Sequence, residues 1–258
     1  MKYIGLFMVL FLFSCGNSRK INGDVVEQAI WDVGRINRYE AAGKSSSDTS
    51  RATIDYILAR NDAPLKHITD SLVANYLGLE CCKDGSQQVT PQQLEAHADL
   101  FLSEYIDLTE QDSSATFPWY MHAGIDFCFV GDAYVKADFS METYTGGAHG
   151  NANFTTYMID TETAAIVRLE DICTDIPQLE KRAEALFRKQ YGINAKASLS
   201  EEGFWFPDNL FHLNRNFSFE NKTLTFAFNQ YEIAAYAMGV FYIELPFQEI
   251  NDLLKIKK

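Results

Sequence analysis

The chain has 258 residues, of which 47% are apolar and 22% charged, so it can form a core and is not intrinsically disordered. Its 22 Lys and Arg residues against 35 Asp and Glu residues give a net charge of −13, which argues against a nucleic-acid-binding surface. Aromatic residues make up 14% of the chain, which favours a sheet-rich fold over a helical bundle.

The beginning of the chain has the pattern of a secretory signal peptide. Its apolar run, Tyr3–Phe13, is shorter than the roughly 20 residues needed to span a bilayer. The run ends in Leu12-Phe13-Ser14-Cys15-Gly16, which resembles the lipobox of bacterial lipoproteins. This resemblance implies a signal peptide over residues 1–14, acyl chains on Cys15 and a lipidated tether over residues 15–24. An ordinary cleavable signal with an accidental cysteine is the alternative.

Lipidation at Cys15 would place the protein in the bacterial cell envelope, held at a membrane through its lipid anchor. No Asp follows Cys15 directly, which resembles lipoproteins sorted to the outer membrane, so we expect an outer-membrane protein facing the periplasm. This compartment permits disulfides. Four further cysteines follow in the chain: Cys81, Cys82, Cys128 and Cys173. Adjacent cysteines seldom meet disulfide geometry, and Cys128 lies in a strand-like run where we expect a buried thiol.

Periodicity predicts alternating blocks of helices and strands in the first part of the chain. Residues Val25–Arg38 fit both a helix and a strand. The elements expected after them are a strand at Arg51–Arg60, a helix from Pro64 to Gly78, a helix from a Thr90 N-cap to about Leu108, strands at Phe117–Val130 and Ala133–Tyr144 around a Gly131-Asp132 turn, and a strand at Asn153–Asp160.

The remainder of the chain repeats this mixture. The elements expected there are a helix at Pro177–Tyr191, a hairpin of Phe217–Phe219 and Leu224–Phe228 around Asn221-Lys222, a strand at Val240–Leu245 and a terminal helix at Pro246–Leu254. The order predicts an α+β fold, with antiparallel sheets, helices packed on one face, and two associated sub-domains.

Three segments of the second half resemble a known extracytoplasmic family. They are Tyr144–Gly150 followed by Leu169–Ile172, then Phe217–Phe228, and finally Asn229–Gly239 followed by Leu245–Phe247. These motifs resemble the ectodomain of RsiV-type anti-sigma factors and the non-catalytic N-terminal region of PdaC-type peptidoglycan deacetylases. The resemblance implies a PdaC-like α+β region over residues 25–152 and an RsiV-like α+β domain over residues 153–258. Over residues 22–115 only the order of elements fits.

The resemblance implies a role in the cell envelope, since some members of this family are receptors that bind lysozyme. The chain shows no second apolar segment, no cytoplasmic anti-sigma region and no deacetylase motifs with paired His and double Asp. We therefore expect a lipid-anchored, non-enzymatic binding module whose ligand is a lysozyme-like cationic protein or peptidoglycan glycan. The alternatives are an envelope hydrolase acting on peptidoglycan fragments and a scaffold lipoprotein of an envelope complex.

Catalytic and metal-binding signatures are missing from the sequence. Neither CxxC nor HExxH spacing occurs, the histidines stand singly, and no GxSxG elbow is present. The sequence therefore predicts no catalytic residue, no metal site and no cofactor. Glycosidases act through a pair of carboxylates, but among 35 acidic residues most pairs that could be chosen arise by chance.

Residues for recognition are expected in turns and irregular stretches, because each strand face in such a fold buries one side. In the first stretch, glycines can adopt positive φ and expose backbone N–H groups, although they can equally serve only to reverse the chain. The candidates in this stretch are Tyr144, Gly146, Gly147, His149 and Asn151.

The second stretch contains three consecutive aromatic residues, Phe204, Trp205 and Phe206, before Pro207. No single strand face can bury all three rings, so at least one should be exposed or covered by another segment. Trp205 and Phe206 are the binding candidates here, against the alternative of a loop folded onto the core. The tyrosines Tyr231, Tyr236 and Tyr242 are expected in the sheet core, not on a carbohydrate-binding platform.

Overall fold

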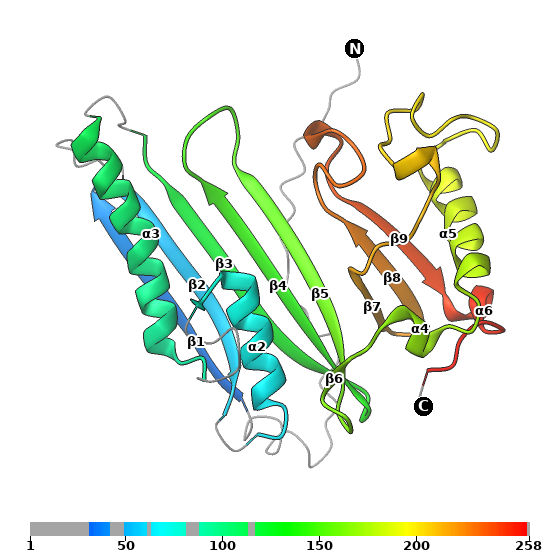
Figure 1. Ribbon diagram of the computed structural model, residues 1–258, viewed down its shortest axis with the longest axis horizontal. Helices are drawn as coiled ribbons and strands as arrows, with labels where there is room; N and C mark the ends of the chain where they lie inside the picture. Colours follow the sequence, from blue (N-terminus) through cyan, green and yellow to red (C-terminus); the bar gives the residue numbers. More distant parts are fainter. Residues whose placement is uncertain (1–30, 42–48, 61–62, 81–87, 113–116, 257–258) are drawn as a thin grey trace.

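The computed structural model describes residues 31–41, 49–60, 63–80, 88–112 and 117–256. Within these ranges the chain forms an α+β fold with a six-stranded sheet beside a three-stranded sheet, as Figure 1 shows, and this confirms the predicted fold class. The expected signal peptide at 1–14, the lipidated Cys15, the tether at 15–24 and the Cys81–Cys82 pair lie outside the described residues.

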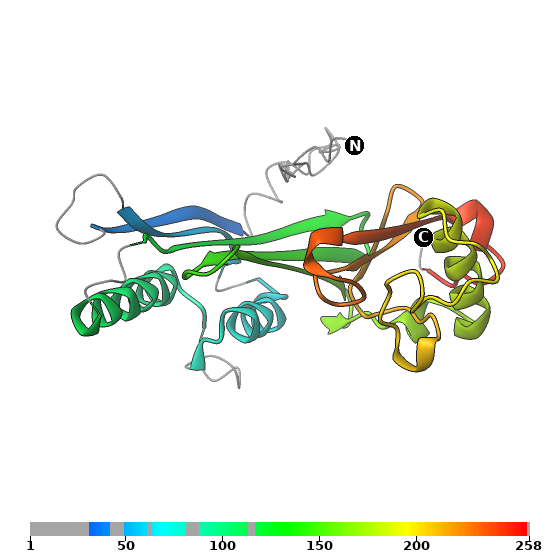
Figure 2. The same cartoon turned by 90° about the horizontal axis from the view of Figure 1, so that it is seen from above.

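The larger sheet contains six strands in sequence order. They are β1 (Trp31–Ala41), β2 (Thr49–Ala59), β3 (Tyr120–Val130), β4 (Tyr134–Tyr144), β5 (Asn151–Asp160) and β6 (Ala165–Ile166). All neighbouring pairs are antiparallel except β2 and β3, which are parallel. A parallel pair requires a long crossover, which here contains α2 (Lys66–Leu77) and α3 (Pro91–Gln111). Figure 2 shows both helices on one face of the sheet.

Strand alternation separates a core face from a polar face. On β3, the buried residues Ala123, Ile125 and Phe127 pack in the core shared with α2 and α3. Asp126 and Cys128, at alternate positions, point to the opposite face and are only partly buried. Cys128 is therefore not the fully buried thiol that the sequence suggested. The described part of the ambiguous N-terminal pattern, from Trp31 onward, is a strand, because β1 pairs along its length with β2.

The helix termini follow the local sequence signals. At the start of α3, the backbone N–H of Thr90 donates to Oε1 of Gln93 at 2.7 Å, and Pro91 occupies the first turn. Helix α2 ends at Gly78, whose φ of 70° fits a left-handed C-cap. Helix α3 continues to Gln111, three residues past the predicted end, because backbone hydrogen bonding persists beyond the last apolar position of the stripe.

The smaller sheet contains β7 (Phe217–Glu220), β8 (Thr223–Phe228) and β9 (Phe241–Pro246). Helix α5 (Ile176–Gln190) buries Leu179, Ala183 and Phe187 in the core of this half. The short helices α4 (Leu169–Ile172) and α6 (Phe247–Ile250) and the 3-10 turns η2 (Pro207–Asn209) and η3 (Tyr236–Met238) complete it.

The predicted terminal helix Pro246–Leu254 is wrong beyond its first turn. Helix α6 stops at Ile250. One local bond follows, from the N–H of Leu253 to the carbonyl of Ile250, and the backbone then pairs with residues 172–174. The N–H of Thr174 donates to the carbonyl of Leu253 at 2.8 Å, and that of Lys255 donates to the carbonyl of Ile172 at 2.9 Å. A long-range bridge thus replaces the local helix.

The sub-domain boundary was expected between residues 152 and 153. It falls inside β5, which pairs along its length with β4 and belongs to the larger sheet. The change from one sheet to the other follows Ile166, at the end of β6. The glycine-rich segment before β5 is a hairpin turn within the larger sheet, between β4 and β5.

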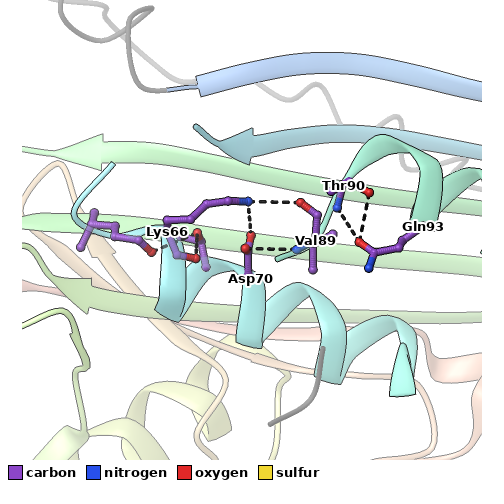
Figure 3. Close-up of polar contacts among 7 residues, drawn as sticks. Lys66, Asp70, Val89, Thr90 and Gln93 are labelled. Carbon is purple, nitrogen blue, oxygen red and sulfur yellow. Dashed lines mark hydrogen bonds and ion pairs between the residues drawn. The ribbon is translucent and has the colours of Figure 1, made fainter. Parts of the chain in front are cut away.

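A buried ion pair on α2 binds the backbone of Val89, which lies just before α3, as Figure 3 shows. Nζ of Lys66 lies 2.7 Å from Oδ1 of Asp70 and donates to the carbonyl of Val89 at 3.1 Å, while the N–H of Val89 donates to Oδ2 of Asp70 at 3.1 Å. Burial raises the pKa of the Asp70 carboxyl, against the opposing hydrogen bond and charge of Lys66. The partner therefore does not fully offset the cost of burying this carboxylate.

Removing one partner of this pair should destabilise the protein strongly. We expect Asp70→Ala to lower the free energy of unfolding by about 3–5 kcal/mol, because Lys66 stays buried without its counter-ion. The double variant Lys66→Met/Asp70→Leu should recover most of that loss. Urea unfolding measures both, with Asp32→Ala as control, since the exposed pair of Asp32 and Arg60 contributes about 1 kcal/mol or less. A double variant as unstable as the single one would contradict this interpretation.

Candidate binding surface

Two asparagine side chains join the larger sheet to the smaller one. Asn216 accepts from the N–H of Thr156 at 2.7 Å and donates to the carbonyl of Phe154 at 2.9 Å. Asn229 accepts from the N–H of Phe154 at 2.8 Å and donates to the same carbonyl at 2.8 Å. The side-chain amides thus take the place of a further strand along the edge of β5, beside which β7 lies in Figure 1.

Asn229 also begins the loop between β8 and β9, which Glu232 shapes. The N–H of Asn229 donates to one carboxylate oxygen of Glu232 at 2.7 Å, and Nδ2 of Asn214 donates to the other at 2.7 Å. Tyr231 adopts a φ of 64°, which turns the chain sharply within this loop. These contacts bring the loop to the end of the β4–β5 hairpin, where η3 lies in Figure 1.

The hairpin turn itself requires its glycines. Gly146 and Gly147 have φ values of 108° and 93°, a region that side chains disfavour, and a Cβ on Gly146 would also collide with the ring of Phe117. The hydroxyl of Tyr144 donates to the carbonyl of Gly147 at 3.1 Å, which closes the turn. The expectation that these glycines reverse the chain is confirmed, and the reversal presents His149 at the surface.

His149 connects the two loops. Its ring stacks on Tyr236, with centroids 3.8 Å apart and planes inclined by 13°. Its Nδ1 lies 2.8 Å from the carbonyl of Gly150, so we assign the proton to Nδ1. Nε2 is then the acceptor for the hydroxyl of Tyr231 at 3.4 Å. We call Tyr144, His149, Tyr231 and Tyr236 the aromatic cluster.

The aromatic cluster continues toward the polar face of the larger sheet. Tyr120 stacks on Tyr144 with centroids 5.9 Å apart, and the guanidinium of Arg51 lies over the Tyr120 ring at 5.8 Å. Burial raises the pKa of Tyr120. His149 and Tyr231 are exposed, while Tyr144 and Tyr236 are half-buried, so ring faces and hydroxyl groups are available at one surface.

The structure unites some of the predicted site residues and separates others. Asn151 is exposed at the start of β5, at the foot of the turn. Trp205 is 51% exposed, and its backbone N–H donates at 2.8 Å to the carbonyl of Ile233 in the β8–β9 loop. Phe206 is corrected: it is 4% exposed and packs among Phe187 and other rings of the core, so it is not a surface residue.

Sequence reasoning missed Tyr231 and Tyr236, which were expected in the sheet core. Both lie in the β8–β9 loop, and Tyr231 is 52% exposed. Their separation by an odd number of residues was a usable signal, because a single strand would place them on opposite faces. Tyr242 does lie on a strand, in β9, where it is partly buried.

The chemical groups that this surface presents are aromatic rings, hydroxyl groups and one imidazole. The described part of the chain contains no group of three His, Cys, Asp or Glu side chains placed to hold a metal ion. None of its helices combines the length and apolar character needed to cross a membrane. Stacked rings, hydroxyl groups and an imidazole can hold a ligand by apolar contact and hydrogen bonds.

Comparisons with known proteins match the C-terminal part of the chain, which contributes to this surface, to a protein family. Residues 170–248 match DUF3298, a family described as a protein of unknown function. This range contains Tyr231, Tyr236 and the whole smaller sheet, whereas His149 precedes it. The chain is similar to DUF3298 in its C-terminal part. No curated protein matches the chain.

Two solved structures share the fold. A DUF3298 family member from Bacteroides fragilis superimposes with a TM-score of 0.69 and 21% identity, covering 88% of this chain and 93% of the other. A DUF3298 family protein from Pseudomonas aeruginosa gives a TM-score of 0.57 and 17% identity, covering 87% and 94%. These alignments extend over both sheets, so the arrangement of the larger sheet beside the smaller one is shared.

Asn229 should be a stability determinant although it lies in a connection between strands. We expect Asn229→Ala to lower the free energy of unfolding by about 1–3 kcal/mol, because the N–H of Phe154 loses this acceptor and its carbonyl keeps the donor from Asn216 but loses the one from Asn229. The matched control is Asn153→Ala, which removes an exposed asparagine side chain from β5, next to Phe154, and should change the stability little. Thermal and urea unfolding provide the measurement. Equal stabilities of the two variants would show that the amide of Asn229 does not hold the edge.

Proposed function

We propose that the protein is a lipid-anchored, non-enzymatic binding module of the bacterial cell envelope. The observation that carries the proposal is the aromatic cluster, in which an exposed turn and an exposed loop from two different sheets contribute rings to one surface. Both segments belong to the motifs that resemble RsiV-type ectodomains and PdaC-type N-terminal regions. The match of residues 170–248 to DUF3298 is consistent with that finer assignment.

The lipid anchor is proposed from the sequence pattern alone. The apolar run before Cys15 and the absence of an acidic residue after it support lipidation and an outer-membrane position facing the periplasm. A tether between the anchor and β1 would leave the aromatic cluster free to meet ligands of the periplasm. The lysozyme-receptor and deacetylase-region likenesses both concern proteins that work at the cell wall.

The ligand class that best fits the aromatic cluster is peptidoglycan glycan. The C–H faces of sugar rings pack on flat aromatic rings, and their hydroxyl groups accept and donate hydrogen bonds to tyrosine hydroxyls and imidazole nitrogens. The pair of His149 and Tyr236 offers such a flat face, and Tyr231 supplies a hydroxyl group beside it. A lysozyme-like cationic protein is the second candidate, favoured by the net charge of −13.

The imidazole of His149 gives little support to a hydrolase. Its Nε2 faces the Tyr231 hydroxyl and its Nδ1 faces a backbone carbonyl, so neither ring nitrogen is oriented by a carboxylate. A general base of the kind used in hydrolysis is normally oriented by a third group in that way. Ligand binding needs no such third group, because the contacts of His149 themselves hold its ring at the surface.

Removing a ring from the aromatic cluster should weaken ligand binding without unfolding the protein. We expect Tyr236→Ala to reduce affinity for muropeptides by about tenfold or more, or ~1.4 kcal/mol, because the flat face of the cluster is lost. Calorimetric titration of the purified protein with muropeptides, and separately with lysozyme, is the measurement. Leu100→Ala, which removes an exposed apolar side chain from α3, is the control.

The outcomes of this titration are distinct. Binding of lysozyme alone would transfer the assignment to a cationic protein ligand. Absence of binding to both at millimolar concentration would reject the ligand assignment. Binding that Tyr236→Ala leaves intact would place the site elsewhere.

Trp205 provides a second test of where the ligand binds. Because its ring is 51% exposed while Phe204 and Phe206 are buried beside it, we expect Trp205→Ala to cost ligand affinity more than stability. The same titration and a thermal melt measure the two effects. A variant with a much lower melting temperature and an unchanged ligand affinity would show that Trp205 stabilises the fold and does not bind the ligand.

A further inference from the structure

The outer strand edges of the two sheets differ in whether side chains bond their backbone groups. The outer edge of β5 is bonded by Asn216 and Asn229, as described above. At β9, the Tyr191 hydroxyl accepts from the N–H of Tyr242 at 3.1 Å and donates to its carbonyl at 3.2 Å. In both cases a side chain takes the place of a neighbouring strand. Strand edges without such cover are templates for pairing with another chain.

The edge at β1 has no comparable cover among the described residues. This strand runs over Trp31–Ala41, pairs with β2 on one side, and has no strand on its other side within the described ranges. Two large apolar side chains on it are strongly exposed, Val33 at 75% and Tyr39 at 62%. Both occupy odd positions, whereas Arg38, at an even position, reaches Asp99 of α3, so Val33 and Tyr39 point away from that helix. The side chains of a strand added alongside would pack against both of them.

The sequence of β1 is complementary to itself in one antiparallel register. If two copies pair about a two-fold axis at Ile36, Val33 of each copy lies directly opposite Tyr39 of the other. Aromatic and β-branched residues form favourable cross-strand pairs, worth about 0.2–1 kcal/mol each. The same register sets Arg35 opposite Asn37, which introduces no like-charge pair on that face.

Charged side chains usually protect an edge strand from such pairing, but those of β1 are engaged within their own chain. Asp32 lies 3.0 Å from Arg60, Arg35 pairs with Asp55, and Arg38 lies 2.9 Å from Asp99. Glu40 is the charged residue of β1 for which the described part of the chain shows no ion pair. In the two-fold register Glu40 lies opposite an Asp32 already compensated by Arg60, so the charges do not oppose association strongly.

We propose that two copies of this chain associate through antiparallel pairing of their β1 strands, so that the two larger sheets become one continuous sheet. The dimer would be isologous, with Val33 and Tyr39 buried twice across the axis. It would also carry two aromatic clusters in one particle, and two linked sites bind a polymeric ligand with increased avidity. The proposal concerns association alone and does not depend on the identity of that ligand.

Sedimentation velocity of the purified full chain over micromolar to millimolar concentrations tests the association. We expect a dimer that Val33→Lys/Tyr39→Lys weakens by about tenfold or more, since charges replace both apolar cross-strand partners. Because both side chains are exposed, the fold should survive, which a thermal melt of the variant verifies. Leu100→Lys, an equally polar change at an exposed site on α3, should leave the dimer intact.

Cysteine cross-linking tests the register. A mixture of the single variants Val33→Cys and Tyr39→Cys should form a disulfide between copies under mild oxidation, whereas each variant alone should cross-link no more than the parent chain. A monomer at all concentrations would overturn the proposal and leave the edge for an extended peptide of another protein. A dimer that Val33→Lys/Tyr39→Lys does not weaken, or a cross-link of Val33→Cys with itself, would overturn the β1 pairing.

Discussion

The edge of β5 is the constraint on which the rest of the structure depends. Its backbone groups at Phe154 and Thr156 must be bonded, and no strand of the smaller sheet pairs with them in a ladder within the described residues. Asn216 and Asn229 meet this requirement with four side-chain hydrogen bonds between 2.7 and 2.9 Å. An unsatisfied buried group costs about 1–3 kcal/mol, so these contacts hold the two sheets in one relative position.

The candidate binding surface follows from that position. The loop that carries Tyr231 and Tyr236 begins at Asn229, and the turn that carries His149 begins where β4 ends. Neither segment would present a stacked surface alone, since His149 contributes its ring from one sheet and Tyr236 from the other. The arrangement of rings at this surface is therefore coupled to the association of the sheets, and small changes at the asparagines should affect it.

Local signals in the sequence predicted most of the elements. The Thr90-Pro91 start placed α3, and positive φ values at Asn221 and Lys222 explain the hairpin between β7 and β8. The errors arose where long-range bonding overrides a local pattern. Residues after Ile250 have an apolar spacing that suits a helix, yet they bond to the segment following α4.

The site was predicted only in part for the same reason. The glycines and His149 stood out locally, as did the impossibility of burying Phe204, Trp205 and Phe206 together, and one of the three is indeed exposed. Which ring would be exposed depended on packing against Phe187, and the stacking of His149 on Tyr236 joins positions far apart in the chain. No local pattern specifies such a contact.

Amide hydrogen exchange at Phe154 and Thr156 tests the central claim most directly. If Asn216 and Asn229 act as a partner strand, both amides should be protected from exchange in the native protein to a degree typical of interior strands. The double variant Asn216→Ala/Asn229→Ala should lose that protection. The amides of β5 that bond to β4 should stay protected in the variant. Exchange at the rate of an open strand edge in the native protein would contradict the account.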